Sequence, residues 1–319
     1  MPEPTAVVAG SIPRTGRVGR GLLEFRYLAL VTVIATYGLI VLGGVVRSTG
    51  SGTACPDWPL CKGELVPPLE TKVMIEYMHR LVASLVGLLI LGTVAWAWGR
   101  RRDEPFGARV GLVALVLLGL QIGVGGVTVE TETNSTVVAV HLTIALSLLT
   151  TLIVLAAKAY LSGPVVGLSL RRLPLSAVAS VVVVFALIIV GVFVSQEGAG
   201  LAYPDWPLFD GKVTWATSKV GELHYAHRLV AAVAGVVLAW FVVRVLGRER
   251  DPVVVSSAAA AFVLYTAQVF IGASNVWLDL ATSVRVLHLA LASLLWAVLL
   301  FGIVWSQLRD ATAPQARRA

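Results

Sequence analysis

The sequence predicts an all-α integral membrane protein whose eight transmembrane helices form two four-helix bundles. Its 319 residues are 57% hydrophobic and only 13% charged, a balance far from that of an ordinary soluble domain. The apolar residues gather in eight stretches of about 20 residues each, the length at which a helix crosses a bilayer. In addition, the second half of the chain repeats the first. The short alternating segments of a membrane β-barrel are not seen in the sequence.

The eight predicted spans divide the chain into two bundles, a linker and two tails. The spans cover approximately residues 27–46, 77–99, 109–129, 138–160, 175–195, 223–245, 254–276 and 285–305. The corresponding regions are an N-terminal tail (1–26), an N-terminal bundle (27–160), a linker (161–174), a C-terminal bundle (175–306) and a C-terminal tail (307–319). The first 26 residues lack the apolar core and cleavage site of a signal peptide, so the first helix is expected to be an uncleaved anchor.

The basic residues predict the orientation in the membrane. Seventeen of the 25 Lys and Arg residues fall in segments on the same side as the N-terminus. The positive-inside rule therefore places both termini in the cytoplasm of a bacterial cell, with the protein in the cell membrane. This distribution accounts for the net charge of +7 without a nucleic-acid partner.

The internal repeat is visible in the motif PDWPL, which occurs at residues 56–60 and again at 204–208. The two copies are 148 residues apart, as are His79 and His227, while His141 and His288 are 147 apart. Four helices per copy give both copies the same orientation, as parallel repeats about an axis along the membrane normal. The motif itself favours a turn with a tryptophan at the membrane interface, or a roof over a ligand.

Four of the five histidines belong to the repeat and predict two haem sites. His79 and His227 are expected to open the second and sixth helices, and His141 and His288 the fourth and eighth. These helices run in the same direction, so all four imidazoles should lie at similar depth. A lone histidine there would more often be interfacial, but two matched pairs favour ligation of haem iron from facing helices. Zinc is disfavoured, because no third ligand repeats beside either pair.

Other polar residues near the predicted outer side could serve these sites. Arginines at the outer helix ends are candidate contacts for haem propionates, although each could equally reach the interface as an isolated side chain: Arg47, Arg80, Arg228 and Arg285. Gln121 and Gln268 repeat within two helices, where interhelical hydrogen bonding is the default expectation. Cys55 and Cys61 lie in an outer loop on the oxidising side of the membrane, which predicts a disulfide.

The two copies differ at a few positions, and these favour the first half as the site of chemistry. Glu76 precedes His79 by three residues and shares its helical face, whereas the matching residue of the second copy is His224. Cys55 and Cys61 likewise have no cysteine counterparts in the second copy. The alternative for Glu76 is a carboxylate favoured by the helix dipole.

Taken together, these motifs resemble the haem A synthase family over nearly the whole chain. The resemblance rests on GGVVRSTGSG, CPDWPLC, EYMHR, GGVTV before His141, HYAHR and the final VLHLA. It implies conversion of haem O to haem A, in which the C8 methyl group is oxidised to a formyl group for terminal oxidase assembly. It also implies that His79 and His141 flank the substrate haem, that His227 and His288 ligate a haem b cofactor, that Glu76 is catalytic, and that Cys55 and Cys61 take part in redox or haem handling.

The same resemblance implies partners: membrane lipid, a haem O synthase that supplies the substrate, and an electron acceptor. Two alternative functions remain open at this point. One is a dihaem b cytochrome that only transfers electrons, and the other is a haem transporter, which the two-repeat architecture favours. Identification of the bound pigments by mass would distinguish all three.

Overall fold

The structure is a computed structural model that describes residues 15–161, 163–165, 167–168, 173–213 and 218–316. Parts of the predicted tails and linker, including Arg14, Arg171, Arg172, Arg317 and Arg318, lie outside the described residues. The α-helices are α1 (Thr15–Ser48), α2 (Thr71–Gly99), α3 (Pro105–Glu130), α4 (Ser135–Tyr160), α5 (Leu175–Gln196), α6 (Lys219–Arg248), α7 (Pro252–Trp277) and α8 (Thr282–Ala316), with a short 3₁₀ helix η2 (Ala199–Leu201) after α5. Among the described residues, eight helices are long and apolar enough to cross a membrane. For the described part of the chain, this confirms the all-helical class and the eight candidate spans.

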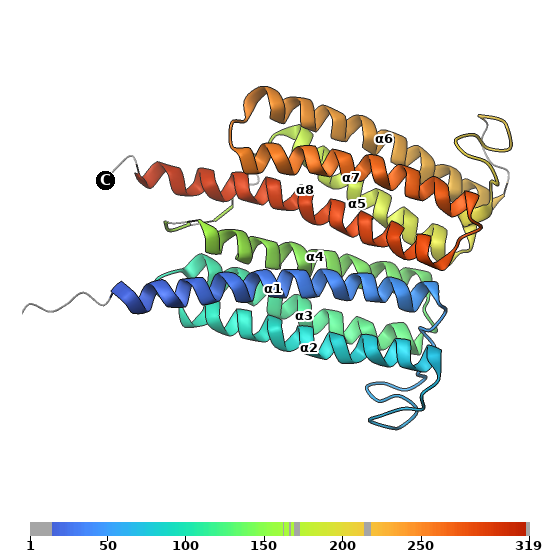
Figure 1. The fold of residues 1–319 in the computed structure, drawn as a ribbon, viewed down its shortest axis with the longest axis horizontal. Helices are drawn as coiled ribbons and strands as arrows, with labels where there is room; N and C mark the ends of the chain where they lie inside the picture. The colour runs from blue at the N-terminus through green and yellow to red at the C-terminus, as the bar shows by residue number, and fades with distance from the viewer. Residues whose placement is uncertain (1–14, 162, 166, 169–172, 214–217, 317–319) are drawn as a thin grey trace, which may run out of the picture.

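The helices lie side by side along the long axis of the molecule (Figure 1). Helices α1 to α4 form one group and α5 to α8 the other, and the loops at residues 49–70 and 197–213 both project from the same end. We call this the loop end. The start of α1 and the end of α8 lie at the opposite end. The side of the membrane that each end faces stays a prediction.

Most helices are longer than the predicted spans. Helix α1 begins at Thr15 and α8 continues to Ala316, so helix extends into both predicted tails. Likewise, α2 begins at Thr71 and α6 at Lys219, before the predicted starts. The apolar stretches omit these polar first turns, but a nucleated helix extends easily because each added residue contributes one hydrogen bond. Ser218 also caps α6 by accepting a hydrogen bond from a backbone N–H.

A shared core holds the two groups together. Its buried side chains come from α1, α4, α5, α6, α7 and α8, and include Leu146 and Leu149 of α4 with Leu295 and Leu299 of α8. Trp296 of this core donates a hydrogen bond to Thr150 Oγ1 across the two groups (3.1 Å). The outward faces of the helices carry exposed apolar side chains, as expected of surfaces that face lipid.

Three hydrogen bonds join the groups at the loop end. All three involve the last residues of α5 or the residue after it. Arg47 donates to the Ser195 carbonyl (2.7 Å), Gln196 to the Thr133 carbonyl (3.4 Å), and Ser135 to Glu197 (2.5 Å). The two halves are therefore tied both in the core and at this rim.

Candidate functional site

The four repeated histidines occupy equivalent places in the even-numbered helices. His79 and His227 lie eight residues after the first residues of α2 and α6, and His141 and His288 lie six residues after those of α4 and α8. At 1.5 Å per residue, this sets them about 9–12 Å inside their helices from the loop end. The expectation that they open the helices is wrong, because the helices begin earlier than hydropathy indicates.

Each of these imidazole rings packs against a glycine on the preceding helix. The pairs are Gly43 with His79, Gly125 with His141, Gly191 with His227, and Gly272 with His288. A Cβ at the glycine would lie 3.4, 3.4, 3.1 and 3.1 Å, respectively, from the nearest ring atom. At Gly191 and Gly272 an added methyl group would crowd the ring, whereas at Gly43 and Gly125 it would be in ordinary contact with the ring. Sequence reasoning missed this role, although the glycines repeat at the same 148- and 147-residue spacings as the histidines.

The second-half pair has the spacing that a bound metal ion between two imidazoles requires. The ring centroids of His227 and His288 are 6.4 Å apart, with 65° between the ring planes. A metal–imidazole nitrogen bond of about 2 Å on each side places the two centroids roughly 6 Å apart. The Nδ1 atoms of both rings are buried without a hydrogen-bond partner. The ring spacing and the glycine cradle fit a haem held by two histidines.

The first-half pair is arranged differently. The amide nitrogen of Gln121 lies 3.1 Å from His141 Nε2, and His141 Nδ1 is buried without a partner. His79 turns its Nε2 edge toward Gly43, whereas the other three rings turn their Cε1 edge toward their glycines. Both pairs offer imidazole nitrogens, but among the described residues a side chain hydrogen-bonds a ring nitrogen of the first pair only.

Glu76 links α2 to the first loop. The side chain is buried, with 4% of the residue exposed. Its Oε1 accepts a hydrogen bond from Arg80 (2.5 Å), and its Oε2 accepts one from the Cys55 backbone N–H (2.9 Å). Both carboxylate oxygens are therefore engaged, one turn of helix from His79.

Arg80 and Arg228 clamp the two loops in the same way. Arg80 donates to the carbonyl oxygens of Cys55 (2.9 Å), Asp57 (2.6 Å) and Leu60. Its repeat counterpart Arg228 donates to the carbonyls at the corresponding loop positions, Tyr203 (3.4 Å) and Leu208 (2.7 Å). These guanidinium groups hold loop backbone, which sequence reasoning did not anticipate.

Arg47 and Arg285 lie between the halves at the loop end. Arg47 holds the Ser195 carbonyl, but its Nε is buried without a partner. Arg285 is close enough for the two positive charges to interact. Two neighbouring cations at a rim are a suitable place for an anionic group.

His224 takes the place of Glu76 in the second half. Its Nε2 accepts a hydrogen bond from Arg228 Nε (3.1 Å), and its ring packs on Tyr203 with centroids 5.7 Å apart. The lone pair that would bind a metal is thus engaged by an arginine. His224 is a loop anchor, a role that the sequence alone did not provide.

The repeated PDWPL motif builds a similar hydrogen-bonded turn in each loop. We call residues 55–63 the first cap and residues 203–211 the second cap. Asp57 accepts hydrogen bonds from the backbone N–H groups of Lys62 (2.5 Å) and Gly63 (2.8 Å). In the second loop, Asp205 accepts from Asp210 (2.9 Å) and Gly211 (2.8 Å). The Gly63 N–H, followed by that of Lys62, holds the pKa of Asp57 below its ordinary value of 3.8, and the bonds from Gly211 and Asp210 do the same for Asp205.

The caps are closed by different chemistry. Cys55 and Cys61 form a disulfide, as predicted, and both are buried. At the matching positions of the second cap, Tyr203 and Phe209 make an edge-to-face contact with centroids 4.9 Å apart. A covalent bond in the first half is therefore replaced by an aromatic contact in the second.

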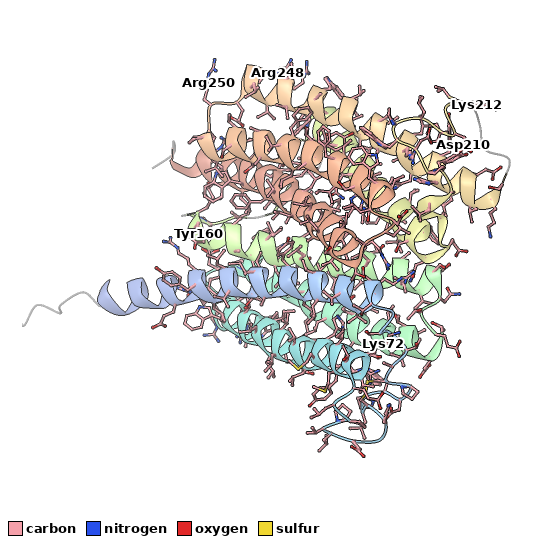
Figure 2. The ribbon with its side chains drawn as sticks, turned by 45° about the vertical axis from the view of Figure 1, so that its right-hand side comes forward. Lys72, Tyr160, Asp210, Lys212, Arg248 and Arg250 are labelled. Carbon is pink, nitrogen blue, oxygen red and sulfur yellow. A yellow bond between two sulfur atoms is a disulfide. The ribbon has the colours of Figure 1, made fainter. Side chains whose placement is uncertain are left out.

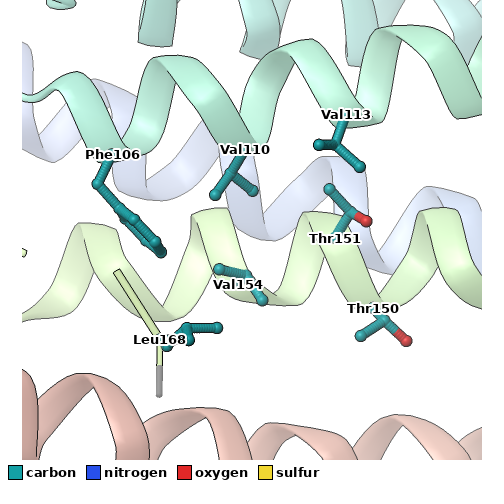
Figure 3. Close-up of a pocket in the computed structure, with 7 residues that line it drawn as sticks. All are labelled: Phe106, Val110, Val113, Thr150, Thr151, Val154 and Leu168. Carbon is teal, nitrogen blue, oxygen red and sulfur yellow. The ribbon is translucent and has the colours of Figure 1, made fainter. Parts of the chain in front are cut away.

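A cavity of about 210 Å³ has no histidine in its lining (Figure 3). It is lined by α3, α4 and the linker residue Leu168, mostly with apolar side chains: Phe106, Val110, Val113, Thr150, Thr151 and Val154. Within the described ranges, no three His, Cys, Asp or Glu side chains gather into a metal-binding group. The two histidine pairs, each with two protein ligands, are thus the candidate metal sites of the described chain.

The chain is similar to known proteins over most of its length. A family model described as cytochrome oxidase assembly protein (COX15-CtaA) matches residues 26–300. The chain is 30% identical over 303 residues to the Heme A synthase of Geobacillus kaustophilus, covering 91% of this chain and 94% of that protein. It is 29% identical over 286 residues to the Heme A synthase of Alkalihalophilus pseudofirmus, covering 85% and 95%. The chain belongs to the COX15-CtaA family of cytochrome oxidase assembly proteins.

Proposed function

We propose that the protein is a haem A synthase, an oxidoreductase that converts the C8 methyl group of haem O to a formyl group for a terminal oxidase. The family match and the relatives named Heme A synthase support a role in haem A biosynthesis. The observation that carries the proposal is the presence of two histidine pairs in equivalent positions with unequal surroundings. Two equal sites would suit electron transfer alone, whereas unequal sites suit one substrate and one cofactor.

In this proposal the second half holds haem b between His227 and His288. Their ring spacing fits an iron ligand pair. Haem b, when bound, supplies a one-electron redox centre. The protein contributes the glycines against which the two rings pack.

The first half would bind haem O between His79 and His141. Arg47 and Arg285 are the better candidates for its propionates, because Arg80 and Arg228 already hold loop carbonyls. The apolar tail of haem O can remain in lipid, since the outward helix faces are apolar. A haem O synthase and an electron acceptor are the proposed partners.

Glu76 is the proposed acid–base group. It is the one buried carboxylic acid among the described residues, and it lies one turn from His79. With water as the source of oxygen, oxidation of a methyl group to a formyl group passes electrons to the proposed electron acceptor and releases protons, and a carboxylate near the reacting carbon could accept one of these protons. Here the carboxylate is bonded to Arg80 and to the Cys55 N–H, so a proton can be taken up when one of these bonds yields. The cap and the chemistry are then coupled through one side chain.

Pigment analysis of the purified protein tests the function. We expect haem b together with haem O or haem A, identified by mass after extraction. His227→Ala should remove haem b, whereas His79→Ala should retain haem b and lose haem A. Haem b alone at two per chain would instead identify a dihaem cytochrome, and freely exchangeable unmodified haem would identify a transporter.

A second experiment tests the role of Glu76. Glu76→Gln keeps an oxygen that can accept from the Cys55 N–H but removes the negative charge. We expect haem O to stay bound while haem A formation falls at least tenfold, within the 10²- to 10⁴-fold that general acid–base groups typically contribute. Formation of haem A at the wild-type rate would exclude the acid–base role.

A further inference from the structure

In the first half, one side chain forms a hydrogen bond to the ring nitrogen that would bind haem iron. The Gln121 amide nitrogen is 3.1 Å from His141 Nε2. An amide NH₂ group donates hydrogen bonds and does not accept them, so His141 Nε2 must be the acceptor. The bond therefore engages the ring's lone pair, and it places the ring proton on Nδ1. That same lone pair would form the bond to iron.

The matching glutamine of the second half is used differently. Gln268 lies 147 residues after Gln121, but its amide donates to the backbone carbonyl of His288 at 2.8 Å. The backbone, and not the imidazole ring, takes this N–H group. His288 therefore keeps its Nε2 lone pair free of the glutamine, although the two halves share both the glutamine and the histidine.

His224 provides an internal comparison. Its Nε2 lone pair is engaged by Arg228 Nε at 3.1 Å. In that case the donor is a permanent cation that also holds the second loop, so the ring stays an anchor. The donor on His141 is a neutral amide, which has no other hydrogen bond among the described residues and whose Oε1 is buried and unpaired. A neutral, singly bonded amide can release its acceptor far more easily than a clamped guanidinium group.

We propose that Gln121 competes with haem iron for the Nε2 lone pair of His141 and thereby keeps the haem of the first half exchangeable. This inference rests on the proposed function and deepens it. A product haem has to leave its site, whereas a cofactor haem has to stay. Gln121 satisfies the buried imidazole when the haem departs, and the second half has no such substitute ligand at His288. Gln121 is thus a residue of substrate and product exchange, not a catalytic residue.

The test is an equilibrium competition for haem. Purified protein is titrated with apomyoglobin as a haem acceptor, and the haem O, haem A and haem b that remain bound are quantified by mass. Gln121→Leu and Gln121→Met both remove the donor with side chains of different shape. Gln268→Leu is the matched control, and retained haem b reports that each variant is folded.

We expect both Gln121 variants to need several-fold more apomyoglobin, up to about tenfold, to release the first-half haem, as follows from the net strength of one hydrogen bond. Their haem b retention should equal that of the wild type, and Gln268→Leu should leave the first-half midpoint unchanged. Unchanged or lower midpoints in both Gln121 variants would overturn the inference.

The outcomes for this inference and for the proposed function are separable. Wild-type protein that carries no haem O or haem A would contradict the function. The competition can then still be measured with added haemin, which the Gln121 variants should bind several-fold more tightly than the wild type. Equal haemin affinity would reject the competition itself.

Discussion

At the scale of single residues, two different side chains make the equivalent hydrogen bond in the two copies of the repeat. Glu76 and His224 occupy the same position, and each accepts a hydrogen bond from the arginine four residues later. Glu76 does so as an anion and also holds the Cys55 N–H, while His224 does so through a ring nitrogen. In the first cap, a carboxylate therefore connects the loop to α2. In the second cap, a histidine ring takes the place of that carboxylate.

Loss of Glu76 should loosen the first cap specifically. Glu76→Ala leaves the Arg80 guanidinium without its carboxylate, and breaking a buried pair in this way typically costs about 3–5 kcal/mol. We expect faster proteolytic cleavage within residues 49–70 in the variant and unchanged cleavage within the second loop. His224→Ala is the matched control and should show the reverse pattern. Equal cleavage of both loops in Glu76→Ala would mean that the carboxylate does not hold the cap.

Asp57 should make the first cap sensitive to acid. Its pKa is lowered by the N–H groups of Gly63 and Lys62. An acid whose pKa is lower in the folded state stabilises that state above its unfolded pKa, here 3.8, and the stabilisation disappears as the pH falls through the lower folded value. The difference in Tm between the wild type and Asp57→Asn should therefore be largest above pH 3.8 and shrink below it. A difference that stays constant down to pH 2 would contradict this assignment.

At the scale of helices, four glycines lie where the odd-numbered helices meet the histidine of the next helix, and at Gly191 and Gly272 an added methyl group would crowd the ring. They are separated by the repeat spacing and sit against the rings at nearly the same distances. A glycine inside a helix costs about 0.5–1 kcal/mol relative to alanine. Its presence opposite each histidine is consistent with a packing requirement that outweighs this cost.

Replacing Gly191 should disturb the second-half site selectively. In Gly191→Ala the new Cβ would be 3.1 Å from His227 Cε1, so the ring has to shift, at a typical cost of about 1–3 kcal/mol for overpacking. We expect lower haem b content and a shifted haem b absorption band. Gly92→Ala is the control, because nothing lies within 4 Å of the Cβ added there. Normal haem b in Gly191→Ala would show that the ring position is not set by this glycine.

Much of the helix and loop arrangement could be predicted from the sequence. The histidine pairs, the repeat and the disulfide follow from spacing and composition, because a fixed offset of 147 or 148 residues brings like residues to like places. The hydrogen bonds of Glu76, Arg80 and Gln121 could not be predicted from the sequence. They depend on the three-dimensional position of a loop backbone or of a side chain on a neighbouring helix. Hydropathy also missed the polar first turns of α2 and α6, which hydrogen bonding extends beyond the apolar stretch.

At the scale of the whole molecule, the two halves are equivalent in plan but joined as one body. The core crosses from α4 to α8, and the rim bonds at residues 195–197 fix the end of α5 against the first half. Arg47 takes part in this rim by donating a hydrogen bond to the Ser195 carbonyl. Ser195 is also the residue that matches Arg47 in the second copy of the repeat. The asymmetry between the halves thus extends from the sites to the joint between them.

The orientation of this body in the membrane can be tested at two exposed positions. Lys212 lies at the loop end, and Arg250 lies at the opposite end (Figure 2). The basic residues predict that the loop end faces outward and that both termini face the cytoplasm. The native cysteines are joined in a buried disulfide, so an introduced cysteine can be labelled selectively. In intact cells or spheroplasts, a membrane-impermeant maleimide should label Lys212→Cys, but should label Arg250→Cys only after the membrane is opened. The reverse pattern would place the loop end, and with it the Cys55–Cys61 disulfide, on the reducing side of the membrane, where such a bond rarely persists.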